Sequence, residues 1–277
     1  MADGGRPGAI GGAQAIDRAV ALLQVLGGAA DGDQRLKDLA AKAGLTQPTA
    51  ARILKALGAH GFVEHDPASR RYRLGLGLLT LAATAAGRSS AKGLARPWLL
   101  RLAQDCTANA FLMLRAGTEA VCVDRIDGGV IVHSITGAIG GRVPLGVGPG
   151  SLAVLAFLDE REAEAIIALN AARYRAFPGI DADRVARALP AIRATGYAFD
   201  PGRVIEGVRG LAVPLRSASA GAVGALSIGA LAATLPDDRV PGLAQRLAEA
   251  ARDIEDGLNP LDPALARPDA YHMEGVP

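Results

Sequence analysis

The chain is poor in cysteine and in aromatic residues. Only Cys106 and Cys122 are cysteines among its 277 residues, and aromatic side chains make up 4%. Two cysteines are too few for a disulfide framework or for a zinc site built on several thiolates. Half of the residues are hydrophobic, so the core is expected to consist of Leu, Val, Ile and Ala.

Long apolar segments are also missing. A membrane-spanning helix needs about 18 apolar residues in a row, and no run in the chain approaches this length. No membrane-spanning helix is therefore expected. The segment "MADGGRPGAIGGAQ" lacks the apolar stretch of a secretory signal. The expected setting is therefore the cytoplasm.

Acidic residues are absent between Asp38 and Glu64. In that stretch "AARILKAL" has apolar residues at helical spacing, and the polar face of the same helix is neutral or basic. Residues 1–80 hold 10 Lys and Arg against 7 Asp and Glu. This excess of positive charge favours a polyanionic partner for the N-terminal part.

The first 75 residues predict three helices and a hairpin. The first helix, "AIDRAVALLQVLGGA", is expected to bury Ile16, Val20, Leu23 and Leu26 and to end at two glycines. "DGDQ" is expected to be a polar loop before a second helix over about 35–43. A third helix starts near Gln47, and "FVEHD" and "RYRLG" follow as strands around the turn "PASR".

The junction between the second and third helices has the spacing of a helix-turn-helix. Ala40 allows close helix crossing, Gly44 permits a left-handed turn, and Leu45 fills the core beneath it. Thr46 is expected to cap the third helix, with Pro48 in its first turn, where a missing N–H costs nothing. Three helices with a following hairpin predict a winged helix-turn-helix.

The rest of the chain predicts helices around an antiparallel sheet. "GLGLLTLAATAAG" forms a helical connector, and a helix over about 94–106 precedes strands "AFLMLRAG", "AVCVDRID" and "VIVHSIT". The Gly-rich "LGVGPGS" leads into a helix, and two more helices, three strands and a final helix follow. Residues 1–13 and 260–277 are expected to be disordered.

Six segments in this order resemble the IclR family of bacterial transcription regulators. They include "RLKDLAAKAGLTQPTAARILKALGAHGFVEHD", "RVPLGVGPGSLAVLAFL" and "GYAFDPGRVIEGVRGLAVPL", and the resemblance covers about residues 14–258. It implies an α+β protein with a winged helix-turn-helix over 14–75, a linker helix over 76–93 used in dimerisation, and a GAF-like effector-binding domain over 94–259.

The implied partners are double-stranded operator DNA, a small organic-acid effector and a second copy of the chain, as a dimer or a dimer of dimers. No cofactor, no metal and no enzymatic activity are expected. Repression and activation both stay open.

The start of the third helix is the expected DNA-contacting element, because a recognition helix places its first residues in the major groove. Gln47 suits adenine and Arg52 suits guanine, and free N–H groups at the helix start favour a phosphate. The wing arginines are candidates for backbone or minor-groove contact. The candidate DNA-binding residues are Thr46, Gln47, Pro48, Thr49, Arg52, Arg70 and Arg71.

The Gly-rich loop before Ser151 is the expected effector site. Its glycines let a ligand approach the backbone, and the helix start after it suits a carboxylate; a cap that holds only water is the alternative. The resemblance adds residues on the facing sheet. The candidate effector-binding residues are Gly148, Pro149, Gly150, Ser151, Leu152, Asp200, Gly210, Leu211, Ser227 and Gly229.

The loop departs from the family where many relatives have His, Thr and Gly-Lys, and Gly210 stands where Cys is frequent. A roomier, more apolar pocket follows as an expectation, with Phe111, Met113 and Val132 as candidate walls. An aromatic or branched carboxylate is therefore expected rather than a two-carbon acid.

Three other functions were weighed. His133 with Ser134, and Asp124 with Asp127, are the only pairs that suggest catalysis, and the latter pair is expected in a solvated hairpin turn. A thiol sensor would need reactive cysteines, whereas Cys106 and Cys122 lie in apolar surroundings. A winged helix used only for protein contact is the third alternative.

Overall fold

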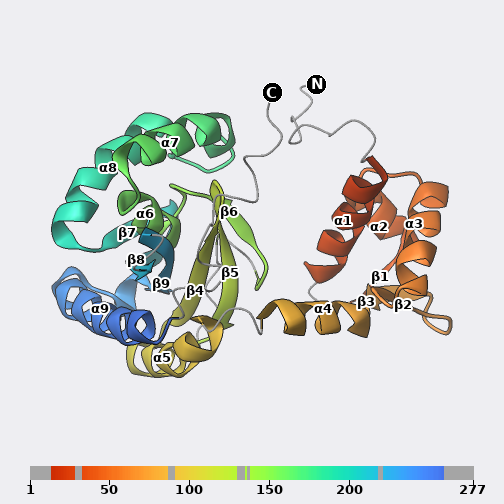
Figure 1. The fold of residues 1–277 in the computed structure, drawn as a ribbon, viewed down its shortest axis with the longest axis horizontal. Coiled ribbons are helices and arrows are strands. Elements are labelled where there is room, and N and C mark those ends of the chain that lie inside the picture. Colours follow the sequence, from red (N-terminus) through yellow and green to blue (C-terminus); the bar gives the residue numbers. More distant parts are fainter. Residues whose placement is uncertain are drawn as a thin grey trace. The chain divides into compact units, whose positions relative to one another are not determined.

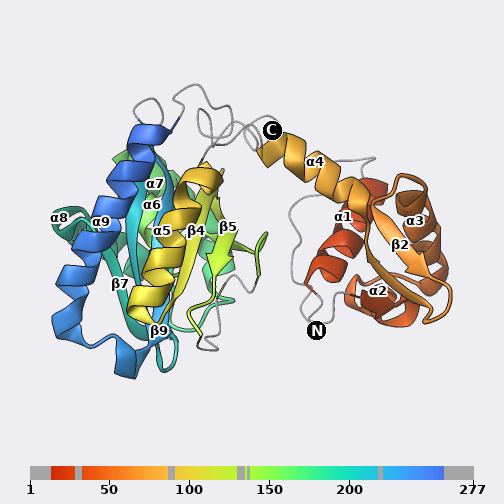
Figure 2. The same cartoon turned by 90° about the horizontal axis from the view of Figure 1, so that it is seen from below.

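The fold is described from a computed structural model, which defines residues 14–28, 33–86, 91–129, 135, 138–217 and 221–258. The chain divides after Ala85 into two compact units, drawn in Figure 1 and Figure 2. Each unit has its own hydrophobic core. No described helix is long and apolar enough to cross a membrane.

The N-terminal unit is a winged helix-turn-helix, as the sequence predicts. A three-stranded sheet in the order β1-β3-β2 carries the wing. Its elements are α1 (Gln14–Gly27), β1 (Asp33–Arg35), α2 (Leu36–Lys42), α3 (Gln47–Ala59), β2 (Val63–Asp66), β3 (Arg71–Leu74) and α4 (Leu76–Ala86).

The turn between α2 and α3 forms as expected. Gly44 adopts a left-handed φ of 66°, which costs glycine little. The N–H of Leu45 then donates to the carbonyl of Ala40 at 2.8 Å. Thr46 occupies the N-cap position, but its side chain makes no capping bond; its Oγ1 lies 2.9 Å from Oγ1 of Thr49 instead.

Two expectations for this unit are wrong. Helix α1 buries Leu22 and Leu26, whereas Ile16 and Val20 are 66% and 44% exposed, because packing selects the Leu22–Leu26 side of a broad apolar stripe. "DGDQ" is not a loop throughout, since Asp33–Arg35 form β1 against β3. These residues form a strand because their backbone groups can hydrogen-bond to the free edge of β3, although their polar side chains are unfavourable in a strand.

Helix α4 starts in close contact with the end of α3. The N–H of Gly77 donates to the carbonyl of Gly61 at 2.9 Å. A Cβ on Gly75 would lie 2.2 Å from that carbonyl oxygen, so only glycine fits there. Leu76, Leu79 and Leu81 nevertheless stay 72%, 65% and 56% exposed.

The C-terminal unit is built on a six-stranded antiparallel sheet in the order β6-β5-β4-β9-β8-β7. Its first helix begins at Ala91, three residues before the predicted start. The strand expected at "VIVHSIT" falls almost wholly outside the described residues. The elements are α5 (Ala91–Cys106), β4 (Asn109–Ala116), β5 (Glu119–Ile126), β6 (Arg142–Pro144), α6 (Pro149–Ala156), α7 (Glu160–Tyr174), α8 (Ala182–Thr195), β7 (Ala198–Ile205), β8 (Val208–Ser217), β9 (Gly221–Leu231) and α9 (Val240–Gly257).

Helices cover both faces of this sheet (Figures 1 and 2). On one face α5 and α9 pack over a core that includes Leu211 and Leu226. On the other, α6, α7 and α8 pack over a core that includes Phe111, Met113 and Ala212. The alternation of strand side chains between the faces decides which residues can meet a ligand beside α6.

Asp124 is not in a solvated turn, contrary to the expectation. It is 0% exposed and accepts hydrogen bonds at 2.9 Å from Nη1 of Arg96 on α5 and at 3.0 Å from the N–H of Arg125. A buried carboxylate needs such partners. Asp124 therefore ties β5 to α5.

Candidate DNA-binding face and effector cavity

The start of α3 presents an exposed polar face. Thr46, Gln47, Pro48 and Arg52 are exposed and Thr49 is half-buried, while Ala50 and Leu54 on the other side are fully buried. The side chains of Gln47 and Arg52 have no hydrogen-bond or ion-pair partner among the residues that the structure describes. They are thus available to an external partner.

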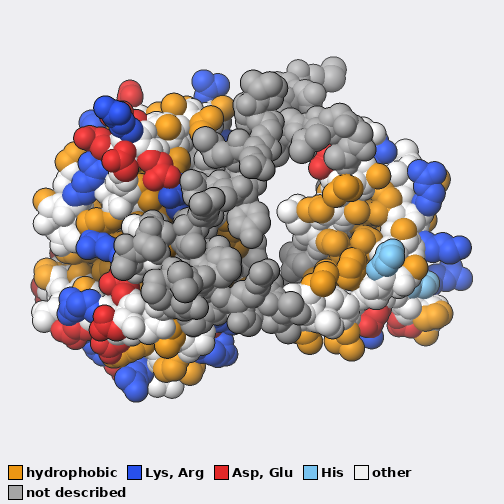
Figure 3. Space-filling model, in the orientation of Figure 1, with side chains coloured by type: hydrophobic (Ala, Val, Ile, Leu, Met, Phe, Trp, Pro, Cys, Tyr) orange, Lys and Arg blue, Asp and Glu red, His pale blue; other side chains and the backbone are white. Residues whose placement is uncertain are grey.

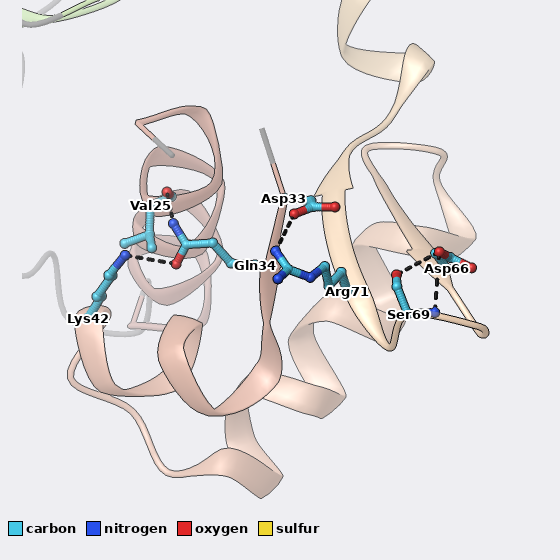
Figure 4. A network of polar contacts seen from close by, with 7 residues as sticks. All are labelled: Val25, Asp33, Gln34, Lys42, Asp66, Ser69 and Arg71. Carbon is cyan, nitrogen blue, oxygen red and sulfur yellow. Dashed lines mark hydrogen bonds and ion pairs between the residues drawn. The ribbon is translucent and has the colours of Figure 1, made fainter. Parts of the chain in front are cut away.

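The wing arginines differ from one another. Nη1 of Arg71 lies 2.7 Å from Oδ1 of Asp33 on β1, and Arg73 pairs with Glu64 at 2.7 Å. Figure 4 shows Arg71 directed at Asp33. Both arginines are therefore neutralised within the domain, and β1 contributes the carboxylate that holds Arg71.

Arg70 is the wing residue that stays available. It is exposed, forms no ion pair within the described chain, and has a left-handed φ of 56°. Such a backbone is uncommon for a residue with a side chain and costs about 1–2 kcal/mol. A strained, exposed arginine at a wing tip is a functional candidate.

The turn that carries Arg70 is held by Asp66. Its carboxylate accepts hydrogen bonds from the Ser69 hydroxyl at 2.6 Å and from the Ala68 N–H at 2.9 Å, as Figure 4 shows in part. These bonds, the Ser69 hydroxyl first, lower the pKa of Asp66. Figure 3 shows Lys and Arg side chains along the edge of this unit that carries α3 and the wing.

A cavity of about 80 Å³ lies in the C-terminal unit between α6 and the sheet. Most of its walls are apolar, including Phe111 and Met113, as the sequence analysis expected; Val132 lies outside the described residues. Of the candidate effector residues, those that line the cavity are Gly148, Pro149, Gly150, Ser151, Asp200, Gly210, Ser227 and Gly229.

Leu152 and Leu211 do not line this cavity. Leu211 belongs to the core under α5 and α9, because it is one residue from Gly210 on a strand and so faces the other side of the sheet. Leu152 packs against the core under α6, α7 and α8 and lines a second cavity next to this one.

The loop before α6 is held rigidly by buried groups. The Ser151 hydroxyl donates to the carbonyl of Val147 at 2.6 Å and accepts from the N–H of Gly146 at 3.2 Å. The Tyr174 hydroxyl donates to the carbonyl of Leu145 at 2.6 Å, and burial raises the pKa of Tyr174 to about 12. Ser151 therefore braces the loop, and its hydroxyl is already engaged.

Arg209 lines this cavity with a buried Nε that has no described partner, and two further groups of donors lie near the start of α6. The backbone N–H groups of Gly150 and Ser151, in the first turn of α6, have no acceptor among the described residues. Ser227 on β9 is 6% exposed, and its hydroxyl also lacks a described partner. A Cβ on Gly150 would lie 3.4 Å from Oγ of Ser227, so these donors converge on one corner of the cavity.

Asp200 has a structural task at the opposite wall. Its carboxylate accepts hydrogen bonds from the N–H groups of Arg203 at 2.8 Å and Val204 at 3.1 Å. These bonds hold β7 where its pairing with β8 is interrupted between Asp200 and Ile205. A ligand carboxylate would be repelled here and attracted to the α6 corner.

Two of the glycines that line the cavity have close neighbours. A Cβ on Gly210 would lie 2.6 Å from Cγ of Pro149, and one on Gly148 would lie 2.6 Å from Cδ1 of Ile135. The space that larger residues would fill is thus already occupied by neighbouring side chains. The expectation of a roomier, less polar pocket than in relatives stays a prediction.

Sequence reasoning missed several apolar walls. Val143, Val147, Val204, Ile205 and Val208 also line the cavity. Three of them, Val204, Ile205 and Val208, flank the turn between β7 and β8, and their apolar character in an edge hairpin is the one signal that singles them out.

Metal and thiol chemistry find no support in the described part of the chain. No cluster of three or more His, Cys, Asp or Glu residues there could hold a metal ion. Cys106 and Cys122 are buried and unpaired by disulfides, and burial raises the pKa of Cys106. A buried thiol with a raised pKa is a poor nucleophile.

A winged helix followed by a helix-flanked sheet with a cavity beside α6 is an arrangement that suits a ligand-responsive DNA-binding regulator. The IclR helix-turn-helix domain matches residues 15–67, and the bacterial transcriptional regulator IclR C-terminal domain matches residues 83–256. The chain therefore belongs to the IclR family of transcriptional regulators, which are not enzymes.

Curated relatives agree. The HTH-type transcriptional regulator XynR of Escherichia coli K12 is 28% identical over 248 residues, which is 88% of this chain and 97% of XynR. The HTH-type transcriptional repressor AllR of the same organism is 28% identical over 261 residues, which is 92% of this chain and 95% of AllR. The chain thus matches both relatives along nearly their whole length.

Solved structures share the fold. An IclR regulator from Alicyclobacillus acidocaldarius superposes with a TM-score of 0.72 at 24% identity, covering 88% of this chain and 98% of that one. An IclR homologue from Microbacterium hydrocarbonoxydans, solved in complex with 4-hydroxybenzoate, has a TM-score of 0.70 at 24% identity, covering 87% and 98%.

Proposed function

We propose that this regulator binds operator DNA through α3 and the tip of the wing, and that a small organic acid bound beside α6 changes its affinity for that DNA. The single observation that carries the DNA half is the polar start of α3, where exposed Gln47 and Arg52 have no described internal partner. On the wing, Arg70 contacts the DNA backbone, and Arg71 stays with Asp33.

The effector half rests on the converging donors. The N–H groups of Gly150 and Ser151 and the hydroxyl of Ser227 border the cavity and have no partner among the described residues, so they are available to hydrogen-bond a ligand. A carboxylate matches three donors at a helix start. The apolar walls favour an aromatic or branched acid, the class to which the 4-hydroxybenzoate in the Microbacterium homologue belongs.

Exposed leucines support the proposal that two copies of the chain associate. Leu76, Leu79 and Leu81 on α4, with Ile16 and Val20 on α1, are exposed, and Figure 3 shows apolar side chains gathered on one face of this unit. A second copy that covers this apolar face would give a dimer, which suits the two half-sites of a palindromic operator. Analytical ultracentrifugation of the full chain measures this state, and a monomer that binds DNA with full affinity contradicts it.

The DNA half is tested with the promoter region next to the gene. We expect wild type to shift this DNA in a salt-dependent manner, and Arg52→Ala to weaken binding by roughly 1–3 kcal/mol and to relax one base position. Arg187→Ala is the matched control, because Arg187 is an exposed arginine on α8. It should leave the affinity for DNA unchanged. Equal affinities for the three proteins would remove α3 from the interface.

The effector half is tested by thermal shift with benzoate, 4-hydroxybenzoate and glyoxylate, since a ligand that binds only the native state stabilises it. Benzoate-type acids are expected to raise the midpoint temperature of unfolding of wild type and not that of Ser227→Ala. This variant is expected to keep the fold, because the hydroxyl that it loses has no described partner. Stabilisation by glyoxylate alone would refute the aromatic-acid assignment.

A further inference from the structure

A second cavity, of about 330 Å³, lies beside the cavity described above. It is enclosed by α8, by the segment 178–180 before that helix, and by β7. Gly148, Asp200 and Val204 line both cavities. The two cavities are therefore neighbours, separated in part by these shared residues.

The smaller cavity is too small to be a complete ligand site. Pockets for small molecules typically enclose about 300–1,000 Å³, whereas this one encloses about 80 Å³. It offers the donors of the α6 corner but little room for the rest of a molecule. The larger cavity offers that room without comparable buried donors.

The walls of the larger cavity suit the apolar body of an acid. Ile180, Ala188 and Phe199 line it and are only half-buried, so part of their apolar surface is left for a ligand. Arg184, Arg203 and Asp200 also line the cavity, and Arg184 donates to the carbonyl of Gly179. The two guanidinium groups outnumber the one carboxylate, which favours an acid over an amine.

The wall between the cavities is a weak part of the sheet. Strand β7 lies at its edge and pairs only with β8, with an interruption between Asp200 and Ile205. The segment there is held by hydrogen bonds from backbone N–H groups to the carboxylate of Asp200, and Val204 within it is half-buried. A small displacement of Val204 would join the two hollows.

We propose that the effector is an elongated acid whose carboxylate binds at the α6 corner and whose apolar body passes Val204 into the cavity under α8. This inference rests on the proposed effector function and specifies its ligand as an aryl-alkanoate rather than a single-ring benzoate. The cavity under α8 is then the subsite that distinguishes longer acids from shorter ones.

Calorimetric titration of the full chain with benzoate and with 4-phenylbutanoate tests the proposal. In wild type, 4-phenylbutanoate is expected to bind roughly tenfold or more tightly than benzoate, because its additional methylenes become buried. Ala188→Phe fills the cavity and is expected to abolish this advantage while benzoate affinity stays within about twofold. Ala191→Phe gives the same test with less risk to folding, because Ala191 lines the same cavity and is exposed.

Ala186→Phe is the matched control, since Ala186 lies on the exposed side of α8 and lines neither cavity. It should behave as wild type, and Ser227→Ala should weaken both acids. Equal binding of the two acids to wild type, or an undiminished advantage for 4-phenylbutanoate in both filled variants, overturns the second subsite and leaves the proposed function standing. Failure of both acids to bind overturns the two together.

Discussion

The starts of α3 and α6 have the same local sequence logic and opposite surroundings. Each has a proline in its first turn and no side-chain cap, so each leaves backbone N–H groups free for an anion. The start of α3 is exposed, whereas residues Gly150 and Ser151 of α6 are buried. Under the proposed function, the same kind of helix terminus would bind a DNA phosphate at the surface of one unit and a ligand carboxylate inside the other.

The largest expected difference between the two sites is in how their binding affinities depend on salt concentration. Releasing counterions from about 6–10 phosphates lowers DNA affinity by roughly 10³–10⁵ between 50 and 200 mM salt. The effector contact is buried, so it is screened far less and is expected to change by less than about tenfold. Parallel gel shifts and calorimetry measure both, and equal salt dependence would break the comparison.

Gly146→Ala tests the rigidity of the α6 loop. Gly146 has a φ of 109°, and a Cβ would lie 2.7 Å from the Tyr174 hydroxyl. We expect a loss of about 2–4 kcal/mol in the free energy of unfolding, from strain plus overpacking. Gly207→Ala, where φ is 76° and a Cβ would meet no atom within 4 Å, isolates the strain and should cost about 1–2 kcal/mol. Equal losses in urea titrations would show that the loop can adapt.

Tyr174→Phe removes the hydroxyl that holds this loop and is expected to cost about 1–2 kcal/mol at pH 8. The folded pKa of about 12 lies above the ordinary value of 10.0, so the protonated hydroxyl stabilises the fold fully below pH 10. That contribution disappears as pH rises toward 12. Urea titrations of wild type and variant should converge over this range. A difference independent of pH would contradict the assignment.

Arg70→Gly tests the proposed DNA contact at the tip of the wing, and it has the smallest expected effect on stability. Relief of left-handed strain, about 1–2 kcal/mol, exceeds the entropy that glycine adds to the unfolded chain, about 0.4–1 kcal/mol. The variant should therefore be more stable by roughly 0.5 kcal/mol, while the salt slope of DNA binding falls by about 1. Arg71→Gln is the counterpart and should keep the slope and lose stability, since Arg71 pairs with Asp33. The reverse pattern would assign the DNA contact to Arg71.

Much of the fold could be predicted from local patterns. The helix-turn-helix follows from Ala40, Gly44 and Leu45, and the wing from two short strands around a polar turn. Helix faces were harder, because α1 has apolar residues around much of its circumference and packing alone decides that Leu22 and Leu26 face inward. The wing shows the same limit, since the bond between Asp33 and Arg71 joins residues 38 positions apart.

The candidate effector site shows a similar division. The glycines and the helix start at Ser151 are legible in the chain, as is the family to which they belong. The Ser151 hydroxyl is engaged locally, by Val147 and Gly146, whereas the place of Ser227 beside Gly150 depends on how β9 lies under α6. The displacement of Leu211 to the other face follows from strand alternation once the register is known.

The sequence by itself determined the class of protein, the two units and the exposed helix start that we propose contacts DNA, because periodicity, glycine turns and charge are local properties. Only the tertiary structure decided which arginine of the wing is available, which serine can meet a ligand, and how much space the cavity offers. Those outcomes depend on contacts between residues distant in the chain, where burial and pairing select one partner among several that the sequence allows.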